Sequence, residues 1–121
     1  MAWKFNSQVP VSIQIASMLR SDIVSGKYPP GEQFPTVRQL AYDASVNPNT
    51  MQKALTFLEE DGLLISKGTI GRFVTSDTEI LETAKRNMQF DFMHGVVTHA
   101  ASLGISKETF INFIKESEGI L

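Results

Sequence analysis

Apolar residues recur at helical spacing in the first quarter of the chain, after a short N-terminal arm. Pro10 suits the first turn of a helix and Gly26 suits its end, so we predict a helix between them. Its apolar face would be formed by Ile13, Ala16, Leu19 and Ile23. The arm carries two aromatic residues that we expect to pack on the body of the domain, Trp3 and Phe5.

A second helix is predicted to begin at Thr36. Gln39 stands three residues after Thr36, which is the spacing of a capping box, in which the two side chains satisfy backbone N–H groups of the first turn. The inward face of this helix would hold Val37, Leu40 and Ala41. A turn over residues 43–46 follows, so this second helix is short.

The third predicted helix begins at Asn47 and ends near Asp61. Asn47 suits the N-cap position and Pro48 the first helical position, while Gly62 suits the end. One face is apolar, with Met51, Ala54, Leu55 and Leu58. The opposite face is polar and holds no acidic residue before its C-terminal end, with Asn49, Gln52, Lys53 and Thr56.

A hairpin is predicted after the third helix. Residues 63–65 and 72–74 have the composition of strands, and the segment from Gly68 to Gly71 would join them. Two helices separated by a tight turn and followed by a hairpin form a winged helix-turn-helix. The third helix would be the one that enters a DNA major groove. The fold class is therefore mainly α with a small β-hairpin wing.

The last part of the chain is predicted to form two helices. Ser76 with Glu79 gives a capping box for a long helix that runs to about Ser102, and Ser106 caps the final helix. We therefore divide the chain into a DNA-binding domain, residues 1–75, and a two-helix tail, residues 76–121. These 46 residues are too few to form a ligand-binding domain. Their apolar side chains need a cover, and a second subunit is the simplest one, through Leu81, Met88, Phe92, Met93, Val96, Phe110, Phe113 and Ile114.

Composition restricts the class of protein. The 121 residues suit one compact domain with a small appendage, and 42% of them are hydrophobic. There is no apolar stretch of transmembrane length and no apolar block typical of a signal peptide, so we expect a cytoplasmic location and no membrane partner. There are no cysteines, which excludes disulfides and thiolate metal sites.

The net charge of −2 by itself argues against strong nucleic-acid affinity, but the charge is unevenly distributed along the chain. Through Thr75 the chain has seven basic and six acidic residues, whereas from Ser76 onward it has four basic and seven acidic ones. The acidic part can point away from DNA. We expect a modest non-specific affinity, because each phosphate that Lys or Arg neutralises strengthens binding through counterion release.

The sequence gives little support for a catalytic site or a metal site. No nucleophile has an evident base, no Gly-rich loop joins a strand to a helix, and the carboxylates are scattered. His94 and His99 are five residues apart, which places them on different sides of a helix, unlike paired metal ligands. We expect a protein that is not an enzyme and that has neither a metal nor a cofactor.

The segment from Val9 to Val74 resembles the GntR family of bacterial transcription regulators. The resemblance rests on PVSIQIASMLRSDIVSGKYPPGEQFPTVRQLA, on VNPNTMQKALTFLEEDGLL and on GRFV, taken together. The two-helix tail resembles the YtrA subfamily, whose members lack the large effector domains of other branches. The resemblance implies a homodimeric repressor that binds an inverted-repeat operator in double-stranded DNA, often one that controls a transporter operon.

The resemblance also implies which residues contact DNA. Arg38 matches an arginine that would bind a phosphate, and the wing glycine Gly71 matches one that approaches the minor groove. The sequence departs from the family at Pro48 and Gln52, where many members have arginines. Lys67 and Arg72 stand in for the usual wing charge. Together with positions of the third helix, the predicted DNA-binding residues are Arg38, Asn47, Asn49, Thr50, Gln52, Lys53, Lys67, Thr69, Gly71 and Arg72.

Two other function classes remain open at this point. Winged helices also bind proteins, and this one is barely basic, so a protein-interaction module is the first alternative. The second is a ligand-responsive sensor with an effector pocket between the tail helices of two subunits. Absence of DNA affinity at low salt would favour the interaction module. A ligand that raises the melting temperature and weakens operator binding would favour the sensor.

Overall fold

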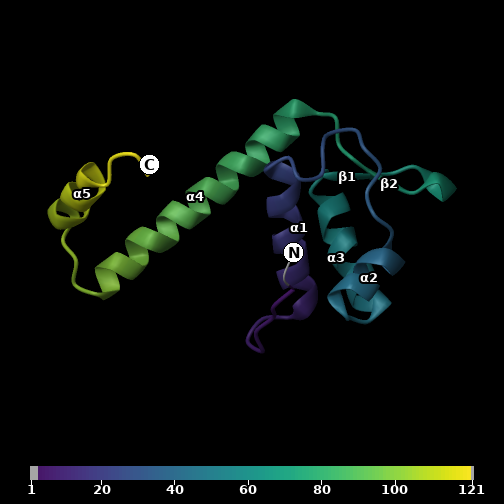
Figure 1. The fold of residues 1–121 in the computed structure, drawn as a ribbon, viewed down its shortest axis with the longest axis horizontal. Coiled ribbons are helices and arrows are strands. Elements are labelled where there is room, and N and C mark those ends of the chain that lie inside the picture. The colour runs from purple at the N-terminus through teal and green to yellow at the C-terminus, as the bar shows by residue number, and fades with distance from the viewer. Residues whose placement is uncertain (1–2, 121) are drawn as a thin grey trace. The chain divides into compact units, whose positions relative to one another are not determined.

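The computed structural model describes residues 3–120 and confirms a mainly helical chain with a small wing (Figure 1). The chain divides into two compact units, residues 1–85 and 86–121, and α4 runs through the division. The elements are α1 (Val11–Val24), α2 (Val37–Ala44), α3 (Pro48–Glu60), β1 (Leu64–Ser66), a 3₁₀ turn η1 (Gly68–Ile70), β2 (Arg72–Val74), α4 (Thr78–Ser102) and α5 (Lys107–Glu116).

The core of the first unit lies around α3. This helix packs against both α1 and α2 and also contacts β1. The four residues predicted for its apolar face, Met51, Ala54, Leu55 and Leu58, are all fully buried. The N-terminal arm packs on the same core through Trp3 and Phe5, as expected. Because one face of α3 is committed to the core, its polar face must point outward.

The inward face of α1 was predicted incorrectly at one position. Ile13 is 47% exposed, whereas Ile15 is fully buried together with Leu19. On a helix with 3.6 residues per turn, Ile15 lies about 40° from Leu19 and Ile13 about 120° away. The predicted face included Ile13 and not Ile15, and the packing direction of the whole helix placed Ile15 in the core instead.

Helix starts follow the predicted chemistry with two corrections. The Thr36 hydroxyl accepts from the Gln39 N–H, and the Gln39 side chain accepts from the Thr36 N–H, which completes the capping box of α2. Pro10 occupies the N-cap position of α1, one residue before its expected place. The start of α4 is capped by Asp77, not Ser76: Asp77 Oδ1 accepts from the N–H groups of residues 79 and 80 at 3.0 and 3.3 Å. The carboxylate also favours the positive end of the helix dipole.

The wing is an antiparallel pair of strands, with Leu64 opposite Val74 and Ser66 opposite Arg72. The first strand begins one residue later than predicted. Residues 31–34 run along the other edge of β2, because the Phe34 N–H donates to the Arg72 carbonyl at 2.8 Å and the Val74 N–H donates to the Glu32 carbonyl at 2.9 Å. The wing is therefore supported from both edges of β2.

The first two turns of α4 belong to the first unit. Ile80, Leu81 and Ala84 are partly buried against its core. Leu81 therefore has an apolar cover within its own unit, although the sequence pattern assigned it to a subunit contact. The sequence-based boundary after Thr75 lies ten residues before the division that the contacts give.

The second unit consists of the rest of α4 and α5. The turn between them includes Gly104, with a φ of 74°, and Ser106 caps α5 by accepting from the Thr109 N–H at 3.1 Å. Its side chains are mostly exposed, and Ala100 is the buried apolar residue of this part of α4. Within residues 3–120, none of the helices has the length and apolar character needed to cross a bilayer.

Candidate nucleic-acid interface

The exposed face of α3 is the central feature of the candidate interface. Asn49, Gln52 and Lys53 are exposed, and Thr50 is half-buried. The helix begins with Asn47, whose side-chain oxygen accepts from the Asn49 N–H at 2.7 Å, so this residue has a capping role in addition to any contact with DNA. The first turn holds no acidic residue, and the positive end of the helix dipole is left for an anion.

Two of the three acidic residues at the end of α3 have cationic partners in the same unit. Arg20 of α1 donates to Asp61 from Nη2 at 2.6 Å and from Nε at 3.1 Å. Arg72 of β2 donates from Nε to the Glu59 carboxylate. These pairs lower the negative potential at the C-terminal end of α3, which would otherwise oppose the approach of a phosphate backbone.

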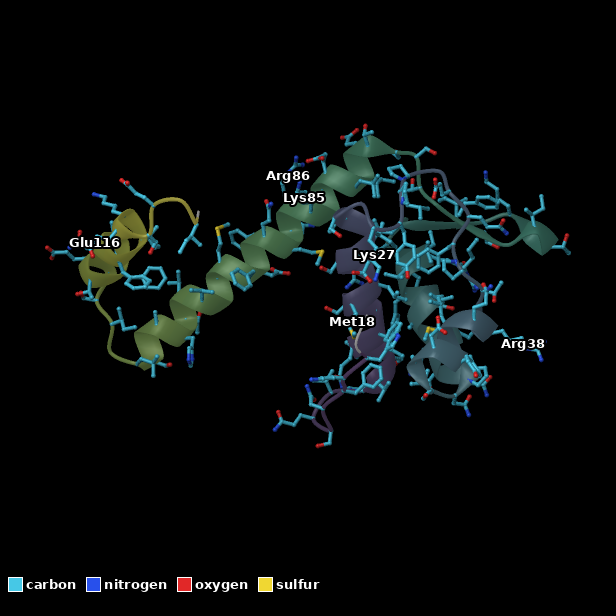
Figure 2. All side chains as sticks on the ribbon, in the orientation of Figure 1. Met18, Lys27, Arg38, Lys85, Arg86 and Glu116 are labelled. Atoms are coloured by element: carbon cyan, nitrogen blue, oxygen red, sulfur yellow. The ribbon has the colours of Figure 1, made fainter. Side chains whose placement is uncertain are left out.

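Arg38 extends outward from α2 into solvent (Figure 2). Tyr42 follows four residues later, so it lies on the same face of the helix, and it is 87% exposed. Two shallow open grooves run along this face, and Arg38 and Tyr42 line both of them. The first groove reaches segment 33–36 beside the wing, and the second reaches Pro48 at the start of α3. Arg38 is thus placed between segment 33–36 and the start of α3.

The predicted wing residues fall into two groups. Lys67 and Thr69 are exposed, and the Lys67 ammonium lies 4.5 Å from the centre of the Phe73 ring. Gly71 has a φ of 120°, and a Cβ there would lie 3.1 Å from the Gln33 side-chain nitrogen. Arg72 is different, because its side chain is only 19% exposed and its guanidinium is paired with Glu59. Arg72 is the first residue of β2, at the end nearest the wing tip, and its side chain is paired with α3.

The second unit carries a large exposed apolar surface. Of the residues predicted for dimerisation, Phe92 is 73% exposed, Phe113 69%, Met93 57% and Ile114 41%. Met88, Val96 and Phe110 are half-buried. The same unit has further exposed apolar residues that are not among those predicted for dimerisation: Phe90, Val97, Leu103, Ile105 and Ile111.

A titratable cluster lies where α1 meets the loop that follows it. Burial, then the negative charges of Asp22 and Asp43, raises the pKa of the Tyr28 phenol. The Tyr28 ring packs against Phe34 at 4.7 Å between centroids, and Lys27 lies 3.8 Å from Asp22. The Tyr28 phenol is therefore neutral, and its packing on the Phe34 ring has a structural role. Across residues 3–120, no group of three or more His, Asp or Glu side chains is placed to hold a metal ion.

Sequence reasoning missed three residues that shape this interface. Tyr42 could have been found from its helical spacing to Arg38. Glu59 and Gln33 could not, because their partners in the wing are distant in sequence: Glu59 pairs with Arg72, and the Gln33 side chain donates to the Ile70 carbonyl at 2.7 Å. The candidate interface therefore includes side chains from α2, α3, the wing and its supporting segment.

Comparison with known proteins agrees with this geometry. The model of the bacterial regulatory proteins of the gntR family matches residues 12–74. The HTH-type transcriptional regulator YhcF of Bacillus subtilis is 30% identical over 112 residues, which cover 93% of each chain. The HTH-type transcriptional repressor YtrA of the same organism is 28% identical over 111 residues, covering 91% of this chain and 85% of YtrA.

A solved structure extends the similarity to the fold of nearly the whole chain. The GntR family transcriptional regulator from Listeria monocytogenes superposes with a TM-score of 0.85 at 30% sequence identity. The match covers 94% of this chain and 100% of that one, so it includes both the winged helix-turn-helix and the two C-terminal helices.

Proposed function

The chain belongs to the GntR family of bacterial regulatory proteins, and from this membership we propose that it is a homodimeric repressor that binds an inverted-repeat operator. As a member it is a DNA-binding transcription regulator and not an enzyme. The observation that carries the proposal is the division of α3 into a fully buried apolar face and an exposed face of amide, hydroxyl and ammonium groups.

Base recognition is assigned to the exposed face of α3. The amides of Asn49 and Gln52 can each accept from the adenine N6 amino group and donate to adenine N7, and the Lys53 ammonium can donate to guanine O6 and N7. Thr50 can contact a base or a phosphate through its hydroxyl. The side-chain oxygen of Asn47 accepts the cap hydrogen bond, which leaves its side-chain Nδ2 group as the donor for DNA.

Phosphate contacts are assigned to α2 and the wing. Arg38 carries an exposed guanidinium on the outer face of α2, and it lines the same groove as Pro48 at the start of α3. Lys67, Thr69 and Gly71 would approach the backbone and minor groove from the wing. Arg72 is assigned a positioning role, because its guanidinium is bound to Glu59 and a direct phosphate contact would break that pair.

Dimerisation is assigned to the exposed apolar side chains of the second unit. Surfaces that expose rings such as Phe92 and Phe113 to water are typical of an interface, because burying this apolar area against a second subunit lowers the free energy. A two-fold dimer would present two α3 helices to half-sites about 10 bp apart, or a multiple of that distance, so the operator should be palindromic.

Repression is the mode of regulation that the similarity to the YtrA repressor favours. The resemblance to the YtrA subfamily also favours a transporter operon as the target. A repressor of this kind acts where the bacterial chromosome lies, which is the cytoplasm.

Selection of binding sites from a random double-stranded DNA pool tests the proposal. The purified full chain is used at moderate salt, in parallel with the double variant Gln52→Ala, Lys53→Ala, whose changes lie on the exposed face of α3. Enrichment of a two-fold symmetric motif by the unaltered chain, and loss of that motif by the variant, is the expected result. A folded dimer that enriches no motif, even at low salt, would refute operator binding and favour a protein partner.

A further inference from the structure

The tip of the wing presents an exposed apolar side chain. Ile70 is 65% exposed at the tip. The wing has two basic residues in residues 64–74, and both have partners within the wing or α3: Arg72 is paired with Glu59, and the exposed Lys67 lies with its ammonium over the Phe73 ring. The exposed side chain at the tip of the wing, the element that would approach the DNA backbone, is thus an isoleucine.

The backbone around Ile70 is held in place by several hydrogen bonds. The Lys67 N–H donates to the Gly71 carbonyl at 2.8 Å, and the Ile70 N–H donates to the Lys67 carbonyl at 3.2 Å. From outside the hairpin, the Gln33 side chain donates to the Ile70 carbonyl at 2.7 Å. Ile70 is therefore exposed on an ordered turn, which lowers the entropy lost when it packs against a partner.

The partner that fits this tip is the minor groove of DNA. Its walls are the C–H edges of deoxyribose, and proteins that enter it use apolar side chains such as Ile there. The side chain of isoleucine makes no hydrogen bond, so it cannot accept from the exocyclic N2 amino group of guanine. Only G·C pairs place this group in the minor groove. The tip should therefore favour A·T pairs at the position it reaches.

We propose that Ile70 is a further DNA-contact residue, one that packs in the minor groove beside each half-site and disfavours G·C pairs there without contributing charge. This inference rests on the proposed function, since it requires an operator. Gln33 is a positioning residue in this arrangement, because it touches the tip backbone and not the DNA. The contact adds sequence preference outside the bases that α3 reads.

The test uses the full chain and the operator recovered by selection, with Ile70→Ala, the conservative variant Ile70→Val, and Ile13→Ala as a matched control. Ile13 is also an exposed isoleucine, but it lies on α1, away from the wing, with 47% of its surface exposed. Folding of each variant is checked by thermal unfolding. Hydroxyl-radical footprinting reports protection of minor-groove sugars, and equilibrium titration at several salt concentrations reports affinity and the salt slope.

The expected result is that Ile70→Ala loses protection at the flanks of the half-sites and binds roughly five- to tenfold more weakly, with an unchanged salt slope. Ile70→Val and Ile13→Ala should retain the flanking protection. Placing G·C pairs at the flank should weaken binding of the unaltered chain, and replacing those guanines by inosine, which lacks the N2 amino group, should restore it.

Two results would overturn the inference. Specific binding with flanking protection unchanged in Ile70→Ala would remove Ile70 from the interface and leave the proposed function intact, with the exposed tip then free for a protein partner. Absence of any specific DNA binding by the unaltered chain would refute both the proposed function and this contact.

Discussion

The guanidinium of Arg72 in the wing donates a hydrogen bond to the carboxylate of Glu59 near the end of α3. Both side chains are largely shielded from solvent, with 19% and 30% of their surfaces exposed. The pair joins the element assigned to the minor groove to the helix assigned to the major groove. The angle between wing and recognition helix therefore depends on an ion pair within the protein.

Disrupting this pair should lower stability without removing a phosphate contact. We expect Arg72→Ala and Glu59→Ala each to lower the free energy of unfolding by about 1 kcal/mol, with a double variant that loses less than the sum. Denaturant unfolding of the four proteins measures this coupling. The salt slope of DNA binding should not change for Arg72→Ala; a decrease of about one would instead indicate a direct phosphate contact.

The polar face of α3 should carry specificity. Gln52→Ala and Lys53→Ala should each weaken specific binding by about 1–3 kcal/mol, because each removes a base contact, and should weaken non-specific binding less. Fluorescence anisotropy on operator and on scrambled DNA measures both. Lys107→Ala, a lysine change in the second unit, serves as the control. Specific binding that survives the double variant would show that α3 does not read bases.

Arg38 should contribute affinity without specificity. Arg38→Ala is expected to weaken operator and scrambled DNA similarly and to decrease the salt slope by about one, since one phosphate contact is lost. The same titrations at several salt concentrations measure this. A loss confined to the operator would assign Arg38 to base recognition.

Gly71 should not accept a side chain. Its φ of 120° is rare for other residues, and an added Cβ would lie 3.1 Å from Gln33. We expect Gly71→Ala to cost about 1–3 kcal/mol of stability, measured by denaturant unfolding, and to displace the wing tip. Gly68→Ala is the matched control, because its φ is 61° and no atom lies within 4 Å of the added Cβ. Its cost should stay near 1 kcal/mol, and equal effects at both positions would exclude a special role for Gly71.

The exposed rings of the second unit should be required for dimerisation. Phe92→Asp places a charge where the proposed interface is apolar, so we expect monomers with weak operator affinity. Sedimentation equilibrium gives the oligomeric state, and Gln89→Asp, a charge added at an exposed polar position of α4, is the control. A stable dimer of Phe92→Asp with full operator affinity would place the subunit contact elsewhere.

Local sequence determined the helices and most of the candidate contact residues. The capping box of Thr36 with Gln39, the Asn47 cap and the buried face of α3 all follow from successive residues spaced at most four positions apart. The order of helix, turn, helix and hairpin, together with the family resemblance, then pointed to DNA. Each of these features depends on backbone geometry that the chain repeats locally, which is why spacing alone was sufficient.

Tertiary structure decided the features that join distant parts of the chain. Whether Ile13 or Ile15 entered the core depended on how α1 packs, and the partner of Arg72 depended on how the wing folds back on α3. The hydrogen bond from Gln33 to the wing tip spans 37 positions. No local pattern records such contacts, because an exposed polar side chain has many possible partners until packing brings one within reach. The sequence thus determined which residues are candidates for DNA contact, and the fold decided which wing residue is held inward and which is presented at the tip.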